Sequence, residues 1–201
     1  MAVNYTVQAE VVDIRSDTPK EDDIFLVDTN VWYWLTYTQA SRSALPYQIT
    51  DYPNYISKAL SRKSLLLYCG LSLSELAHNI EQTEREIFNS NLRPKEYRHN
   101  YPTERANVVA EIQASWSQVT SIAVSTDITI NEATTKTALT RFSTQPLDGY
   151  DLLILEAMEK AGIIQVITDD GDYITVPGIR VFTANQNAIA AASNQNKLLI
   201  R

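Results

Sequence analysis

The stretch from Ile24 to Trp32 constrains the fold more than any other part of this chain. Residues 24–27 are all apolar, and they are followed directly by Asp28 and then by sequence compatible with a helix. A carboxylate in this position lies at the carboxyl end of a buried parallel strand, which is where open α/β folds bind their ligands. Asp28 is therefore the first candidate site residue.

Three further acidic residues stand in comparable settings. They are Glu75 in a predicted helix, Asp151 at the start of another helix, and Asp170 just after a second apolar strand. Magnesium and manganese ions prefer hard oxygen ligands such as carboxylates, and they keep water in their open positions. The four acids therefore predict one site for Mg²⁺ or Mn²⁺, which would serve phosphoryl chemistry without a Ser, Cys or His nucleophile.

Short apolar strands alternate with helical segments along most of the chain. We expect strands at 24–28, 65–68, around 119–124, 163–167 and 179–182, and helices from the first strand through Tyr37, at roughly 54–62, 72–88, 103–118, roughly 131–143 and 149–161. This alternation implies a parallel sheet with helices on both faces. The sequence therefore predicts a three-layer α/β fold around a central parallel sheet.

The 201 residues are enough for one substantial domain. Residues 1–20 alternate loosely in polarity, which predicts an N-terminal arm or added edge strand. Residues 21–184 form the predicted domain, with a helical insertion around 89–118. Residues 185–201 are a polar, Ala-rich tail in which we expect a short helix.

The composition is ordinary for a globular protein, with 44% hydrophobic and 20% charged residues. The single Cys69 cannot form an internal disulfide and is expected to be buried in a reducing compartment. No signal peptide and no run of about 20 apolar residues is evident. We therefore expect a cytoplasmic protein that does not span a membrane. The net charge of -7 disfavours electrostatic binding of nucleic acid over a broad surface but does not exclude a nuclease.

Each acid also has a purely structural interpretation. Asp28 is a favourable helix N-cap, Glu75 could be an exposed helix residue, Asp148 and Asp151 could cap and begin one helix, and Asp169, Asp170 and Asp172 could be turn residues around Gly171. The metal site rests on the joint pattern, because two apolar strands end in carboxylates that a parallel sheet would bring together.

Polar neighbours of these acids are candidates for supporting roles. Asn30 and Thr168 could orient the carboxylates, although both are also ordinary cap and turn residues. For His78, one helical turn after Glu75, we favour a surface or packing role. Residues 89–102 contain Arg93, Lys95 and Arg98, which could contact phosphate, but we favour a solvated loop for this connection.

Four segments together resemble the PIN-domain ribonucleases. The first is residues 27–31, similar to the family's opening strand and first acid, and the second is residues 73–76, similar to the helix of its second acid. Residues 150–157 are similar to the helix of the third acid, where the family commonly has Asp-Ala rather than Asp-Leu. Residues 167–173, followed by 177–181, closely match the last acidic turn and the final strand.

The resemblance covers roughly residues 24–184 and implies divalent-metal-dependent cleavage of RNA. It carries the family's acids to Asp28, Glu75, Asp151 and Asp170 as catalytic metal ligands, with Asp172 and Asp169 as auxiliary ligands. Many family members belong to toxin and antitoxin pairs and many are dimers, so an antitoxin or other protein partner and a homodimer are expectations. The arm, the long segment after Glu75 and the tail distinguish this chain from the compact VapC-type toxins.

Two rival functions remain at this point. One is a PIN-like binding or assembly subunit that keeps its acids but needs a partner and cleaves nothing alone. The other is a metal-dependent phosphatase on another α/β scaffold. The second is weakened because haloacid-dehalogenase-like phosphatases need a second acid two positions after the first, and this chain has Asn30 there. A nucleotide-binding Rossmann fold lacks support because no Gly-rich loop follows Val27.

Overall fold

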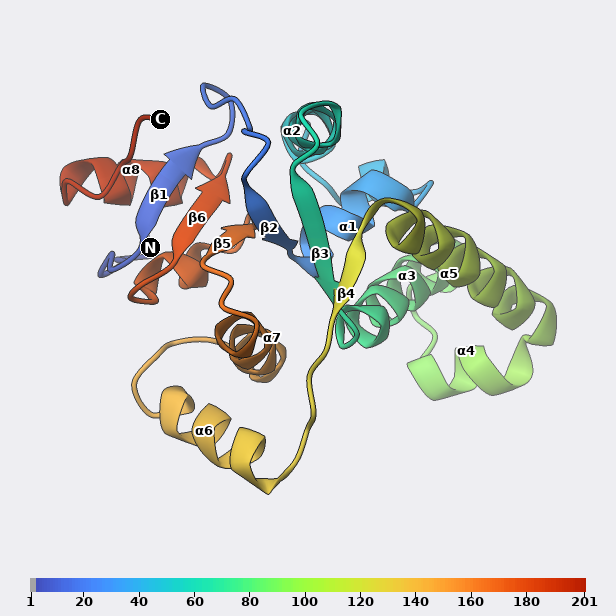
Figure 1. The fold of residues 1–201 in the computed structure, drawn as a ribbon. Coiled ribbons are helices and arrows are strands. Elements are labelled where there is room, and N and C mark those ends of the chain that lie inside the picture. Colours follow the sequence, from blue (N-terminus) through green and yellow to red (C-terminus); the bar gives the residue numbers. More distant parts are fainter. Residues whose placement is uncertain (1–2) are drawn as a thin grey trace.

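The computed structural model describes residues 3–201, which form one all-parallel, six-stranded sheet and eight α-helices (Figure 1). The strands are β1 (Glu10–Asp13), β2 (Ile24–Val27), β3 (Leu65–Cys69), β4 (Val124–Thr126), β5 (Gln165–Ile167) and β6 (Arg180–Thr183). The helices are α1 (Thr29–Thr36), α2 (Asp51–Ser61), α3 (Ser72–Asn89), α4 (Pro94–Asn100), α5 (Pro102–Ile122), α6 (Glu132–Phe142), α7 (Gly149–Lys160) and α8 (Gln186–Asn194), with 3₁₀ turns η1 (Ala40–Arg42) and η2 (Gly171–Thr175).

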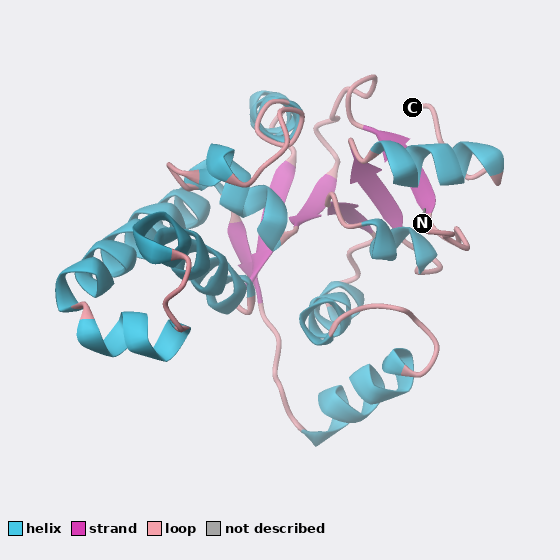
Figure 2. Cartoon of the chain, turned by 180° about the vertical axis from the view of Figure 1, so that it is seen from behind, coloured by secondary structure: helices cyan, strands magenta, loops and turns pink. Residues whose placement is uncertain are grey.

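Side chains from the central strands pack on both faces of the sheet. In β2, Phe25 and Val27 pack in a core with α1, α2 and α5, whereas Leu26 packs in a second core with α7 and α8. Successive strand residues point to opposite faces, so an all-apolar strand needs a helical layer on each side. Figure 2 shows these helices on the two faces from behind. The predicted three-layer α/β fold with a central parallel sheet is confirmed.

The strand order β1-β6-β5-β2-β3-β4 places the chain's switch point between β2 and β5. From β2 the chain moves outward through β3 to β4, and it then returns to the other side of β2 to form β5 and β6. Val27 is in register with Ile167, so these two strands end side by side. Ligands of open α/β sheets bind in the crevice at such a switch point.

The N-terminal segment contributes the edge strand β1, which pairs with β6. The strand covers only residues 10–13, and the alternating residues before it form a docked arm instead. Along this arm, Val7 and Ala9 are buried, and the amides of Gln8 and Ala9 both donate to the carbonyl of Ile174. The arm is thereby held against η2.

Residues 89–102 are mostly exposed, as expected, but they are largely helical and do not form the loop that their composition favours. Pro94 begins α4, where its missing amide proton costs no hydrogen bond, and Tyr97 in this helix is almost completely buried. Pro102 begins α5 in the same way. The insertion is therefore two consecutive helices that pack on each other and on α3 (Figure 1).

The strand expected around 119–124 begins later, at Val124, because α5 continues through Ile122. Val108, Ser115 and Val119 are buried in α5, and Trp116 and Ile122 pack against the same core as Val119. This spacing of three and four residues keeps one helical face on the core, so residues 119–122 complete a helix.

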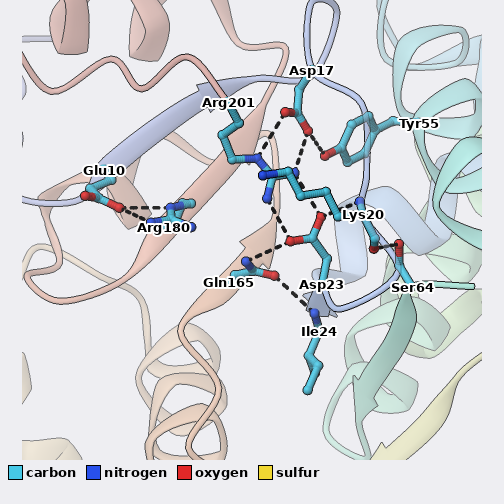
Figure 3. A network of polar contacts seen from close by, with 10 residues as sticks. All are labelled: Glu10, Asp17, Lys20, Asp23, Ile24, Tyr55, Ser64, Gln165, Arg180 and Arg201. Atoms are coloured by element: carbon cyan, nitrogen blue, oxygen red, sulfur yellow. Dashed lines mark hydrogen bonds and ion pairs between the residues drawn. The ribbon is translucent and has the colours of Figure 1, made fainter. Parts of the chain in front are cut away.

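The C-terminal tail crosses back over the sheet after α8. Leu198 forms a β-bridge with Val11, and the Arg201 side chain reaches Asp17 and Asp23 near the amino end of β2 (Figure 3). This contact fastens both terminal segments to the domain. No helix within residues 3–201 combines the length and apolar character needed to cross a membrane.

Candidate metal-binding acidic site

Asp28 follows β2 and caps α1, and its side chain is only 3% exposed. Its backbone amide donates to the carbonyl of Ile167 at 3.0 Å, which continues the ladder between β2 and β5. Its Oδ1 accepts from the amide of Thr29 at 2.6 Å. The structural and functional interpretations of Asp28 are therefore compatible, because one oxygen caps the helix and the other faces the end of β5.

The other oxygen of Asp28 is held by the two neighbours that the sequence singled out. Oδ2 accepts from Asn30 Nδ2 at 2.7 Å and from the Thr168 hydroxyl at 2.5 Å. Asn30 Nδ2 also lies 3.3 Å from Thr168 Oγ1. These contacts fix the orientation of the carboxylate, as is usual for the groups that surround metal ligands.

Asp170 lies directly beside this network, at the start of η2. Its amide donates to Thr168 Oγ1 at 2.9 Å, so one threonine hydroxyl joins the turn of Asp170 to Asp28. Asp170 Oδ1 accepts from the amide of Asp172 at 2.8 Å and caps the 3₁₀ turn. Its second oxygen, Oδ2, has no hydrogen bond within the described residues.

Asp151 comes to the site on the first turn of α7, which begins at the carboxyl edge of the sheet. Asp148 caps this helix by accepting from the amides of Tyr150 and Asp151. The Asp151 side chain is buried and accepts from the hydroxyl of Tyr173 at 3.0 Å. Tyr173 is itself fully buried, so it positions Asp151 without being open to a substrate.

Glu75 reaches the site from the first turn of α3, which follows β3. Its Oε2 is buried and has no hydrogen-bond partner within the described part of the chain. A buried carboxylate oxygen without a partner is costly in the folded state. A proton, a cation or an ordered water would satisfy it.

The carboxylates are close enough to interact electrostatically. Burial raises the pKa of Asp28, Glu75, Asp151 and Asp170, and nearby carboxylates raise each of them further. The charge of Glu75 acts on Asp28, and the charge of Asp28 acts on Asp151. The structure therefore brings the four predicted acids together in one site of concentrated negative charge.

Asp148 belongs to this acidic site, although its sequence context indicated only a helix cap. Its charge raises the pKa of Glu75, Asp151, Asp170 and Asp172. No sequence pattern distinguishes this role, because an N-cap aspartate is common at the start of any helix. The parallel topology makes it relevant, since α7 begins beside the ends of β2 and β5.

Asp169 and Asp172, the two auxiliary candidates, differ in their surroundings. Burial, followed by the charge of Asp170, raises the pKa of Asp172, which places it beside the acidic site. Asp169 accepts hydrogen bonds from Tyr47, Gln48 and Tyr52 at 2.9, 2.7 and 2.6 Å, and its charge also raises the pKa of Asp170. Asp169 thus anchors the turn that presents Thr168 and Asp170.

The basic residues of the insertion lie on and beside α4. Arg98 donates to Glu81 at 2.6 Å, and Arg105 of α5 donates to the same carboxylate at 2.8 Å. Arg93 and Lys95 lie at the start of α4, which follows the far end of α3. Because a helix rises about 1.5 Å per residue, Glu81, the partner of Arg98, lies only about 9 Å along α3 from Glu75.

The donor set fits a divalent cation in charge and in chemistry. Its oxygens are hard ligands, the charges that raise their pKa values are carboxylates, and Glu75 Oε2 lacks a partner. Within residues 3–201, however, no three Asp, Glu, His or Cys side chains are arranged as the ligands of one ion. The site therefore concentrates the right groups without drawing them into a coordination shell.

Crowding of these carboxylates predicts that Asp151→Asn stabilises the metal-free protein by about 1–2 kcal/mol. Asn keeps an oxygen for the Tyr173 hydroxyl but removes one negative charge. In the wild type, the raised pKa of Asp151 gives stability that is full below the ordinary value of 3.8 and is lost as the pH rises through the raised value. Thermal unfolding in EDTA should therefore show a larger gain at about pH 8 than at about pH 5.

The exposed Asp22, before the opposite end of β2, supplies the control for this prediction. Asp22→Asn also removes one negative charge but lies away from the acidic site, so its melting temperature should change little. An Asp151→Asn protein that is no more stable than the wild type in EDTA at about pH 8 would contradict the inferred repulsion.

Comparison of the sequence with protein-family models and with curated proteins gave no match.

Proposed function

We propose that this chain is a divalent-metal-dependent, PIN-like endoribonuclease that cleaves RNA phosphodiester bonds. The observation that carries the proposal is the meeting of Asp28, Glu75, Asp151 and Asp170 at the switch point of a parallel sheet. A structural role for each acid alone does not account for four carboxylates whose pKa values are all raised by burial and by neighbouring carboxylates. Buried like charges are found preferentially at functional sites.

The proposed roles follow from what holds each side chain. Asp28 is fixed by Asn30 and Thr168, and Asp151 is fixed by Tyr173, so these two carboxylates are rigid ligand candidates. Glu75 and Asp170 each keep an oxygen without a hydrogen bond within the described residues. A bound Mg²⁺ or Mn²⁺ would supply an activated water and charge stabilisation at the phosphate.

The resemblance to PIN domains supports RNA rather than another phosphodiester as the substrate. It also supports a protein partner, such as an antitoxin, and a homodimer as parts of this proposal. A PIN-like subunit that cleaves only with its partner is the second candidate.

The deciding experiment is cleavage of end-labelled single-stranded RNA and DNA with Mn²⁺ or Mg²⁺, beside an EDTA control. We expect RNA to be cut within the chain in the presence of either ion and to remain intact in EDTA. Preferential cleavage of DNA would correct the substrate. Intact RNA under every metal condition would reject a nuclease that acts alone and would favour the partner-dependent subunit.

A further inference from the structure

The N-terminal arm brings a tyrosine to the edge of the acidic site. Tyr5 precedes β1 and is half-buried, and its phenol ring lies over Gly171, the residue after Asp170. A Cβ atom on Gly171 would lie only 2.2 Å from the Tyr5 hydroxyl oxygen. The absence of a side chain at this glycine therefore allows the hydroxyl to approach the turn that carries Asp170.

The backbone on either side of Tyr5 is firmly held. Gln195, just after α8, donates from Nε2 to the carbonyl of Tyr5 and accepts from the amide of Val7, both at 2.9 Å. The next residues donate to the carbonyl of Ile174 in η2. The tail and η2 thus fix the backbone around Tyr5, and this places its side chain over Gly171.

The Tyr5 hydroxyl lies beside the negative charges of Asp170 and Asp172. It makes no hydrogen bond within residues 3–201, whereas the other end of the residue is fixed. The hydroxyl keeps its proton at neutral pH, because the ordinary pKa of a tyrosine is about 10. The surrounding carboxylates repel an anionic ligand. An uncharged hydroxyl does not add to this repulsion and can donate a hydrogen bond to the ligand.

We propose that Tyr5 is a substrate-binding residue of the acidic site, whose hydroxyl donates a hydrogen bond to a phosphate oxygen of the bound RNA. This inference rests on the proposed nuclease function. Tyrosine hydroxyls are among the ordinary donors to nucleic-acid phosphates, and such contacts position the strand without reading its sequence. Of the basic residues Arg93, Lys95 and Arg98 on or beside α4, Arg98 is already paired with Glu81.

Two substitutions remove this contact in independent ways. Tyr5→Phe deletes the hydroxyl and keeps the ring, whereas Gly171→Ala leaves Tyr5 unchanged but adds the methyl group that displaces its ring. Gly171 does not have a positive φ, so alanine there causes no backbone strain. Tyr101→Phe is the matched control, because Tyr101 lies between α4 and α5 and packs on Phe88.

The test combines cleavage kinetics with fluorescence anisotropy of a labelled single-stranded RNA in Ca²⁺. We expect Tyr5→Phe and Gly171→Ala each to raise KM and the Kd for RNA about tenfold, with kcat nearly unchanged. The double variant should be no worse than the weaker-binding single variant, because both changes remove one contact. Mn²⁺ affinity by calorimetry should stay at the wild-type value, which separates substrate binding from damage to the site.

Each outcome bears on one proposal or both. If the wild type binds and cleaves RNA and both variants match it, the Tyr5 proposal is overturned and the nuclease stands. Loss with Gly171→Ala but not with Tyr5→Phe would overturn the hydroxyl contact. If the wild type binds RNA without cleaving it and both variants bind about tenfold more weakly, Tyr5 stands and the nuclease fails. A wild type that neither binds nor cleaves RNA overturns both.

Discussion

Asp28→Asn should lower the rate of metal-dependent RNA cleavage by about 10²- to 10³-fold, the usual cost of removing one preorganised electrostatic group from an active site. The change replaces a carboxylate oxygen by an amide group at the junction of β2 and α1. Because Oδ2 accepts from both Asn30 and Thr168, an amide nitrogen there would face the Asn30 amide instead of accepting from it. The variant loses a negative charge and the fixed orientation of a proposed ligand.

The fold should tolerate this substitution. Asn is as good a helix cap as Asp, so its oxygen can still accept from the amide of Thr29, and removing one of several crowded charges relieves repulsion. Circular dichroism and the melting temperature in EDTA should therefore stay close to those of the wild type. Cleavage is measured under single-turnover conditions, with Asp22→Asn as the control from the opposite end of the same strand.

Two results would count against the assignment of Asp28. Full cleavage by a folded Asp28→Asn protein would mean that the reaction occurs elsewhere on the chain. An equal loss in Asp22→Asn would mean that the effect is a general consequence of charge. Weaker binding of Mn²⁺ by Asp28→Asn alone, measured by calorimetry, would show that the loss of activity begins with the metal.

The meeting of Asp28 and Asp170 could be predicted because both follow directly from strand ends. Two apolar strands terminate in acids, and parallel pairing in register places those ends side by side. The contacts of Asn30 and Thr168 follow from the same logic, since they flank the two acids within two residues. Short-range spacing on a known element is the information that a sequence carries most directly.

Other parts of the site depend on tertiary packing that no local pattern specifies. Tyr5 lies more than 160 residues from Gly171 in the chain, and the pair meets only because the arm docks on η2. The buried bond from Tyr173 to Asp151 likewise requires η2 and α7 to pack together. Asp169 resembled its acidic neighbours in sequence, but the three donors from Tyr47, Gln48 and Tyr52 lie more than 100 residues away.

A second large effect is expected near the amino end of β2, where Arg201→Met should lower the free energy of unfolding by about 3–5 kcal/mol. The Arg201 side chain is 6% exposed and lies between Asp17 and Asp23, whose side chains are 1% and 5% exposed (Figure 3). Methionine can retain much of the apolar packing against Phe182. It leaves two buried carboxylates without their cation, which is far more costly than the loss of an exposed pair.

The Arg180 and Glu10 pair, also drawn in Figure 3, supplies the matched control. Its side chains are 25% and 54% exposed, so Arg180→Met should cost only about 0.2–1 kcal/mol. Urea unfolding monitored by tryptophan fluorescence measures both variants. Equal and small losses would contradict a dominant role for the buried Arg201 contacts.

The pH dependence of the Arg201 network follows from Asp23. Burial by itself would raise the pKa of Asp23, but hydrogen bonds led by those from Arg201 hold it below its ordinary value of 3.8. Its contribution to stability is therefore present above 3.8 and is lost as the pH falls through the depressed value. Arg201→Met should remove this part of the acid sensitivity. Restoring neutrality with Asp17→Asn and Asp23→Asn in the same chain should recover most of the lost stability, because the penalty comes from the unpaired charges.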